Sequence, residues 1–208
     1  MTLADILARA EKGEFPAADA GVTVCPAPSA REAAVVAFTA HTVVASDADP
    51  DWVRSRLPAG DLGAPLNPPF LTALCARLDR RVNNIDMMLL APALVAEIGG
   101  LVEVTDRNHP RVRRALRYRD DVRVWACAGG VVLLGRGLGG RMEVAVEVGP
   151  AGRGQGWGRR LALAARTLAG GPLWAQVAPG NAASVRAFLA AGYRPVGAEA
   201  LLVTATGG

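Results

Sequence analysis

A cluster of glycines joins a strand-like run to a helix-like run in the last third of the chain. Residues 142–148 alternate apolar and polar side chains, which is the period of a half-buried strand. Residues 161–168 repeat apolar side chains at helical spacing, and the Gly170-Gly171-Pro172 run predicts the end of that helix. Between the two runs, where missing Cβ atoms let backbone amides close around an anion at a helix N-terminus, lie Gly154, Gly156 and Gly158. The stretch therefore predicts a phosphate-binding turn.

Two well-known phosphate-binding motifs are excluded here. A P-loop needs Gly-Lys-Ser/Thr, whereas Gln155 follows Gly154, and a Rossmann turn needs an acidic residue about 20 positions on. No Asp or Glu occurs between Glu147 and Glu199. The same interval holds six arginines, which suit a ligand with several phosphates: Arg153, Arg159, Arg160, Arg166, Arg186 and Arg194. A tight connection that merely requires small residues is the alternative interpretation of the glycines.

The run Arg153-Gly-Gln-Gly-Trp-Gly158 resembles the Q/R-x-x-G-x-G/A signature of the GNAT superfamily of acyl-CoA-dependent N-acyltransferases. Residues 173–178 resemble the strand that follows in that family, and residues 181–193 resemble its next helix and turn. The resemblance covers roughly residues 101–208. It implies an α/β fold with a mixed sheet, and it implies acetyl-CoA as the cosubstrate.

The resemblance also implies a set of binding residues. The pantetheine arm would bond to main chain near Val146 and Val148, and Asn181 and Ser184 would be its polar neighbours, although helix capping alone would explain Asn181. The pyrophosphate would rest on the amides of the turn, which comprises Arg153, Gly154, Gln155, Gly156, Trp157, Gly158 and Arg159. A backbone amide of the first strand would stabilise the oxyanion.

Two glutamates on the strand are candidates for the catalytic base. Strand alternation puts Glu143 and Glu147 on one face, opposite the valines at 144, 146 and 148. If the valines pack under the helix, both carboxylates face the acceptor pocket, where one of them would take the amine proton. Solvent-facing strand residues are the alternative. No general acid is assigned, because Phe188 stands seven residues after Asn181, where many family members have a tyrosine.

Composition excludes several other classes. The three cysteines have no C-x-x-C spacing, so neither a disulfide framework nor a metal site is expected. No basic segment followed by a long apolar run occurs near Met1, so we expect no signal peptide, no membrane span and a cytoplasmic location. The net charge is +4, but the arginines are dispersed, and we expect no nucleic-acid partner. The Arg and Ala bias favours a bacterial source.

Gly99-Gly100 is the candidate joint between residues 1–98, an N-terminal extension or degenerate half-domain, and residues 99–208, the catalytic domain. In the first part a strand is expected at 21–25, and the capping-box pattern from Ser29 to Glu32 predicts a helix over 33–40. His41 is expected to be a packed or capping histidine. Near the C-terminus, residues 193–196 and 201–204 are expected to form a hairpin.

Together these patterns predict an enzyme that transfers an acetyl group directly from acetyl-CoA to a primary amine in a ternary complex. The amine acceptor, a small molecule or a peptide, is not identified by the sequence. A non-catalytic acyl-CoA sensor or partner-binding protein is the alternative, which Phe188 favours and the two glutamates oppose. A homodimer is possible if residues 1–98 expose apolar side chains.

Overall fold

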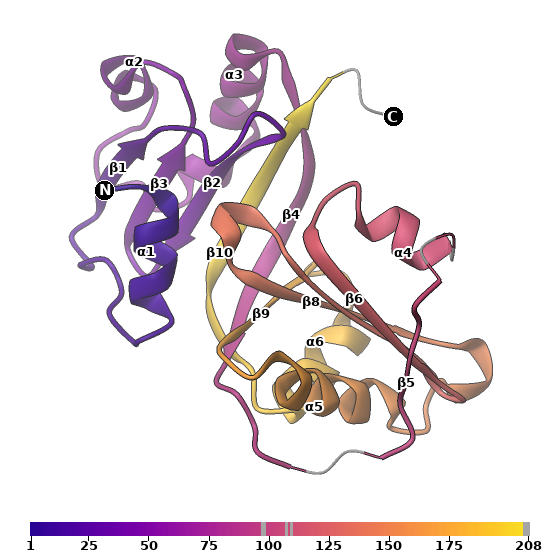
Figure 1. Ribbon diagram of the computed structural model, residues 1–208. Helices are drawn as coiled ribbons and strands as arrows, with labels where there is room; N and C mark the ends of the chain where they lie inside the picture. The colour runs from indigo at the N-terminus through magenta and orange to yellow at the C-terminus, as the bar shows by residue number, and fades with distance from the viewer. Residues whose placement is uncertain (97–98, 107, 109, 206–208) are drawn as a thin grey trace. The chain divides into compact units, whose positions relative to one another are not determined.

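The computed structural model describes residues 1–96, 99–106, 108 and 110–205, which pack as two compact units of mixed α/β structure (Figure 1). The mixed α/β fold was predicted from the sequence. The first unit combines residues 1–87 with the chain from Val196 onward, and the second comprises Met88–Pro195. The predicted joint, Gly99-Gly100, lies among the described residues, whereas residues 97 and 98 do not. The division into an extension over residues 1–98 and a catalytic domain over residues 99–208 stays a prediction.

The first unit contains a five-stranded sheet with helices. In chain order its elements are α1 (Leu3–Ala10), β1 (Gly21–Cys25), β2 (Glu32–Phe38), β3 (His41–Ala45), α2 (Pro50–Ser55), the 3-10 turn η1 (Ala64–Leu66), α3 (Pro68–Leu78), and most of β4 (Arg80–Ala91) and β10 (Arg194–Thr204). The strand order is β1-β3-β2-β10-β4. β1 pairs with β3 in parallel, whereas β2 is antiparallel to both β3 and β10.

Two sequence predictions in this unit are wrong. Residues 32–38 form strand β2 instead of opening a helix, because their unbroken apolar run is almost wholly buried between neighbouring strands β3 and β10. The Ser29 hydroxyl accepts a hydrogen bond from the Arg31 amide and so closes a local turn, not a helix cap. The C-terminal hairpin is also absent, since residues 194–204 run as one strand whose register with β2 extends from Ala198 to Val203.

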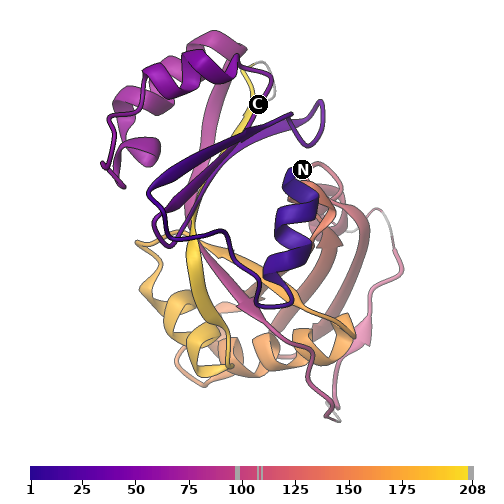
Figure 2. The same cartoon turned by 90° about the vertical axis from the view of Figure 1, so that its left-hand side faces the viewer.

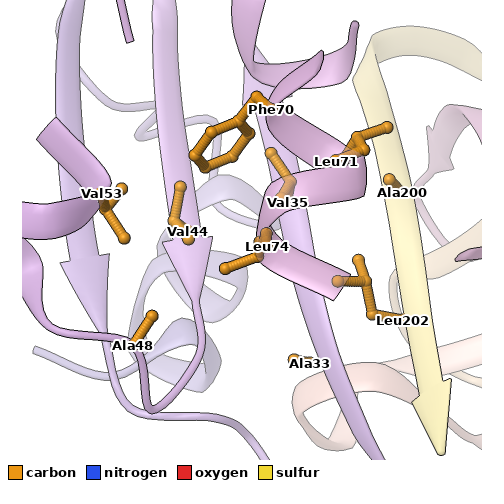
Figure 3. Close-up of a cluster of buried hydrophobic side chains, with 10 residues drawn as sticks. All are labelled: Ala33, Val35, Val44, Ala48, Val53, Phe70, Leu71, Leu74, Ala200 and Leu202. Carbon is orange, nitrogen blue, oxygen red and sulfur yellow. The ribbon is translucent and has the colours of Figure 1, made fainter. Parts of the chain in front are cut away.

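The core of the first unit lies between α3 and its sheet. Figure 3 shows the side chains of α3 directed at those of the strands, with Phe70 and Leu74 near Val35 and Val44. All four are buried, as is Leu202 on β10. Burial of each such side chain contributes about 1.5–3 kcal/mol. His41 is packed as predicted: its side chain is 11% exposed, Nδ1 lies 2.7 Å from Asp19 Oδ1, and Nε2 lies 2.9 Å from Thr23 Oγ1.

The second unit contains the predicted phosphate turn. Its elements are β5 (Val102–Glu103), α4 (Pro110–Ala115), β6 (Asp120–Cys127), β7 (Gly130–Arg136), the 3-10 turn η2 (Leu138–Gly140), β8 (Met142–Val148), the 3-10 turn η3 (Pro150–Gly152), α5 (Trp157–Ala169), β9 (Leu173–Val177) and α6 (Ala182–Ala190). The strand order is β4-β9-β8-β7-β6-β5, with β5 to β8 antiparallel and β8 parallel to β9. The sequence also predicts that Asn108 or His109, with Pro110, opens a helix over residues 111–118, and His109 lies outside the described residues.

Helices cover the two faces of this sheet separately. α5 and α6 lie side by side in both views (Figures 1 and 2), and α4 lies on the other side of β6. Val112 and Ala115 of α4 pack with Val124, Leu133 and Ala145 on one face. The other face, toward α5, carries the buried side chains of Val132 and Val144. The strand alternation therefore defines an α4 face and an α5 face.

Candidate functional site

The predicted phosphate turn has a backbone that glycine favours at two points. β8 ends at Val148, η3 follows, and α5 begins at Trp157. Gly154 has φ +74° and Gly156 has φ +77°, in the left-handed region where a Cβ would cost about 1–2 kcal/mol. The turn thus uses two of its glycines for conformation, and Gly156 is the N-cap of the helix.

The third glycine and the tryptophan serve packing. A Cβ at Gly158 would lie 3.1 Å from Ala187 Cβ, so Gly158 permits the close approach of α6 to α5. Trp157 lies against the β6–β7 turn, where a Cβ on Gly129 would overlap its indole ring. The Arg160 guanidinium lies 4.2 Å from the centre of the same ring. Trp157 therefore links the phosphate turn to the neighbouring hairpin.

The N-terminus of α5 presents backbone donors. Its first helical bond runs from the Arg160 amide to the Gly156 carbonyl at 3.2 Å, so the amides of residues 157–159 have no partner within the helix. The side chains of Arg153 and Arg159 are exposed nearby in sequence. Gln155 instead donates from Nε2 to the Ala151 carbonyl at 2.8 Å and so holds the turn closed. This combination of amides, helix dipole and arginines suits a phosphate-bearing ligand.

Strands β8 and β9 separate next to this turn. Their parallel register comprises only Glu143 with Trp174 and Val144 with Ala175, across strands whose residues are all described. On its other side β8 stays paired with β7 as far as Val148. Beyond Val144, the backbone of β8 that faces β9 therefore has no ladder partner there. This separation lies where the sequence predicted a gap for the pantetheine arm, and the roles of Val146 and Val148 in binding it stay predictions.

The two candidate bases share a face but differ in their surroundings. Val131 pairs with Glu147 and Gly135 with Glu143, which places both glutamates on the α4 face and the valines of β8 on the α5 face, as predicted. The Glu143 carboxylate is 8% exposed and lies 2.9 Å from both Arg119 Nε and Arg141 Nε. It also accepts the Leu138 amide at 3.3 Å. Glu147 is exposed. The ion pairs account for the burial of Glu143, and which of the two glutamates is the base stays a prediction.

No hydroxyl from Tyr193 replaces the one missing at Phe188. Phe188 is buried, with its ring 4.9 Å from that of Tyr193 in an edge-to-face arrangement at 83°. The Tyr193 hydroxyl donates to the Ala162 carbonyl of α5 at 3.2 Å. Burial raises the pKa of Tyr193 well above its ordinary value, and the nearby Arg166 offsets this only in part. Tyr193 is therefore held protonated against a helix, and the general acid stays unassigned.

Asn181 is the N-cap of α6, as predicted. Its Oδ1 accepts a hydrogen bond from the Ser184 amide at 3.1 Å, and Ser184 is half-buried. Capping accounts for Asn181 fully, so contact of either residue with the pantetheine arm remains a prediction.

Sequence reasoning missed two groups of polar residues. One is the pair of arginines that hold Glu143, of which Arg141 is 1% exposed and also lies 5.2 Å from the centre of the Trp174 ring. For Arg141 the sequence offered a signal: it stands two residues before Glu143, and residues two apart in an extended chain point to the same face. The other is Gln176 on β9, whose buried amide atoms have no hydrogen-bond partner among the described residues. A lone glutamine in an apolar strand was its only signal.

The described residues contain no group of three His, Cys, Asp or Glu side chains arranged to hold a metal ion. Within the same residues, every helix is too short or too polar to cross a membrane.

Comparisons with known proteins give likenesses of fold alone. No protein-family model and no curated protein matches the chain. A GCN5-related N-acetyltransferase from Kribbella flavida is 20% identical over 67% of this chain and 65% of its own, with a TM-score of 0.44. A structure described as a GNAT-family acetyltransferase from Novosphingobium aromaticivorans is 19% identical over 62% and 69%, with a TM-score of 0.43.

A third similar structure is a tandem GNAT protein of the clavulanic acid biosynthesis pathway, 14% identical over 82% of this chain and 63% of its own, with a TM-score of 0.40. All three carry the family name that the motif at residues 153–158 resembles. Their likeness to this chain concerns part of the fold and says nothing of its substrate. The function is therefore argued from the geometry of the turn and the sheet.

Proposed function

We propose that the chain is an N-acetyltransferase that binds acetyl-CoA at the 153–159 turn and transfers the acetyl group to a primary amine in a ternary complex. One observation carries the proposal: a left-handed glycine turn and an open helix N-terminus stand beside the point where β8 and β9 separate. The turn suits a pyrophosphate, and the gap suits an extended arm that ends at the α4 face. Nothing in this arrangement needs a metal.

Each step of this reaction is assigned to particular groups of the chain. The amides of residues 157–159 and the guanidinium of Arg153 hold the phosphates. The carboxylate of Glu147 takes the proton of the incoming amine, directly or through one water. A new N–C bond then forms, the C–S bond breaks, and the departing thiolate takes a proton from solvent. Phe188 supplies no proton, which makes water the expected acid.

The test is calorimetric titration with acetyl-CoA, comparing the wild type with Arg153→Ala. We expect Arg153→Ala to weaken binding roughly tenfold to a hundredfold, because a charge-assisted bond contributes about 1.5–3 kcal/mol. Arg117→Ala is the matched control, since Arg117 is also exposed but lies outside the interval between Glu147 and Glu199. An unchanged dissociation constant in Arg153→Ala would reject the phosphate contact, and a wild type that does not bind would reject the function.

Thiol release against a panel of amines then separates the two candidate functions. Release that depends on the amine supports the transferase. The second candidate is an acyl-CoA-binding protein without catalysis, which is favoured by one observation: the ring of Phe188 is packed against Tyr193 where a hydroxyl is often found. Tight binding with no release from any amine would support that candidate.

A further inference from the structure

Gln176 lies on the same sheet face as the candidate base. Trp174 pairs with Glu143 in the parallel register, and paired residues of neighbouring strands point to the same face. Gln176 lies two residues after Trp174 on β9, so it is on the same α4 face, beside Ala145 of β8. It follows the last registered pair, so it stands where β8 and β9 have begun to separate.

The carboxamide of Gln176 is buried at both ends without a partner. Neither Oε1 nor Nε2 has a hydrogen bond, although both atoms are out of contact with solvent, and among the described residues only the Thr167 hydroxyl shares this state. An unpaired buried polar group costs about 1–3 kcal/mol. Its neighbour on the same face of β9, Trp174, is fully buried, so an apolar side chain such as leucine would fit this face without an unpaired polar group. The two unpaired atoms therefore point to a partner that binds there.

The chemistry of the carboxamide narrows the class of partner. Oε1 accepts hydrogen bonds and Nε2 donates them, a short distance apart in one plane. A carboxylate would satisfy only Nε2, and an ammonium group would satisfy only Oε1. A chain with two successive amides can turn the N–H of one and the C=O of the next toward the same side, and it then satisfies both atoms, because the N–H and C=O of a single trans amide point in opposite directions.

We propose that Gln176 is a recognition residue for two successive amides of a substrate bound between the separating ends of β8 and β9. This inference rests on the proposed function. Two sources have this chemistry: the pantetheine arm of the acyl donor, and a peptide that serves as the amine acceptor. In either case the carboxamide would fix the position of the bound chain relative to Glu147, which lies on the same face.

Gln176→Leu tests the proposal, since it removes both polar atoms and keeps the volume close. Thr167→Val is the matched control, because it removes the other buried unpaired group. Each variant is titrated with acetyl-CoA and with adenosine 3′,5′-bisphosphate, which carries the nucleotide phosphates but no pantetheine arm. A donor source predicts that Gln176→Leu binds acetyl-CoA about tenfold more weakly and the bisphosphate equally well.

An acceptor source predicts a different pattern. Acetyl-CoA and the bisphosphate then bind Gln176→Leu as they bind the wild type. With CoA present, alanyl-alanine amide binds the variant about tenfold more weakly, and butylamine binds both proteins alike. In both cases the midpoint of urea unfolding for Gln176→Leu stays unchanged or rises, because an unpaired polar group has been removed.

Three results overturn the proposal. They are unchanged binding in every titration, an equal loss of affinity for acetyl-CoA and the bisphosphate, and a loss of stability in Gln176→Leu. The first result would mean that water alone satisfies the carboxamide. The wild-type titration distinguishes the two proposals. If the wild type binds acetyl-CoA and Gln176→Leu gives the same dissociation constants in every titration, only the role of Gln176 is rejected. If the wild type has no affinity for acetyl-CoA, the proposed function itself is rejected.

Discussion

Glu143 and Glu147 have the same side chain and the same sheet face, but their partners differ. Glu143 is bound by two guanidinium groups, and one of them, on Arg141, is itself buried. We expect Glu143→Gln to lower the free energy of unfolding by about 3 kcal/mol, because it leaves a buried charge without its partner. Glu147→Gln should change it by less than about 0.5 kcal/mol, since Glu147 is exposed. Urea denaturation measures both.

The same two variants separate packing from catalysis. Glu147→Gln should lower the rate of acetyl transfer more than the affinity for acetyl-CoA, because a general base acts on the amine and not on the nucleotide. The comparison is made with thiol release and with calorimetry on one protein preparation. Full activity in Glu147→Gln with a good acceptor would remove Glu147 as the base. Equal stability of the two variants would show that the ion pairs of Glu143 with Arg119 and Arg141 do not contribute to the free energy of unfolding.

At the scale of elements, the hairpin of β6 and β7 supports the phosphate turn through one ring. A methyl group on Gly129 would overlap the Trp157 indole, so Gly129→Ala should displace Trp157 from its place at the start of α5. We expect a loss of about 1–3 kcal/mol in stability and a weaker affinity for acetyl-CoA. Thermal unfolding and calorimetry measure the two effects.

Gly149→Ala is the control for this prediction. Gly149 donates its amide to the Gly129 carbonyl at 3.1 Å, its φ is −60°, and a Cβ there would meet no atom within 4 Å. It should therefore fold and bind acetyl-CoA as the wild type does. If Gly129→Ala binds acetyl-CoA normally, the position of Trp157 does not shape the turn.

The elements that were predicted correctly are those whose local pattern agrees with their surroundings. Residues 142–148 form one strand with the predicted bounds, because one of its faces packs under α5 and alternation shows this. Residues 32–38 misled the prediction, because alanine and valine in an unbroken apolar run fit a helix or a strand buried on both faces. The pairing with β10 decides between them, and that partner lies about 160 residues further along the chain.

The candidate site was predictable only as far as it is local in sequence. The glycine turn, the helix after it and the Asn181 cap each depend on neighbouring residues, and the structure contains all three. Arg119 and Gln176 could not be placed in this way. Arg119 reaches Glu143 from the connection between α4 and β6, and the lack of partners for Gln176 follows from where two strands separate.

At the scale of the whole molecule, each unit carries a titrating group that ties its stability to pH. In the first unit the Asp19 carboxyl has its pKa lowered, first by the hydrogen bond with His41 and then by the Gly21 amide. A lowered pKa in the folded state stabilises the protein above the ordinary carboxyl value, and this contribution is lost as the pH falls through the folded-state pKa. Asp19→Asn should therefore be less stable than the wild type at pH 7.

The difference between Asp19→Asn and the wild type should shrink below about pH 4, the ordinary range of an aspartate. Urea denaturation at a series of pH values measures it. Asp51→Asn is the control, because the Asp51 carboxylate is 94% exposed and its ion pair with Arg54 lies on the surface of α2. If the difference in the free energy of unfolding between Asp19→Asn and the wild type is the same at every pH, the charge of Asp19 does not contribute to stability.

In the second unit the titrating group is the Tyr193 hydroxyl, which affects stability at alkaline pH. The pKa of Tyr193 is raised by burial, so above about pH 10 the unfolded chain releases a proton that the folded chain keeps. Stability then falls by about 1.4 kcal/mol for each pH unit. Tyr193→Phe loses the bond to the Ala162 carbonyl and should be about 1 kcal/mol less stable at pH 8. It has no proton to release, so its stability should equal that of the wild type near pH 11 and exceed it above. Denaturation curves at pH 8 and 11.5 measure the reversal, and parallel losses in the two proteins would mean that the Tyr193 hydroxyl is open to solvent.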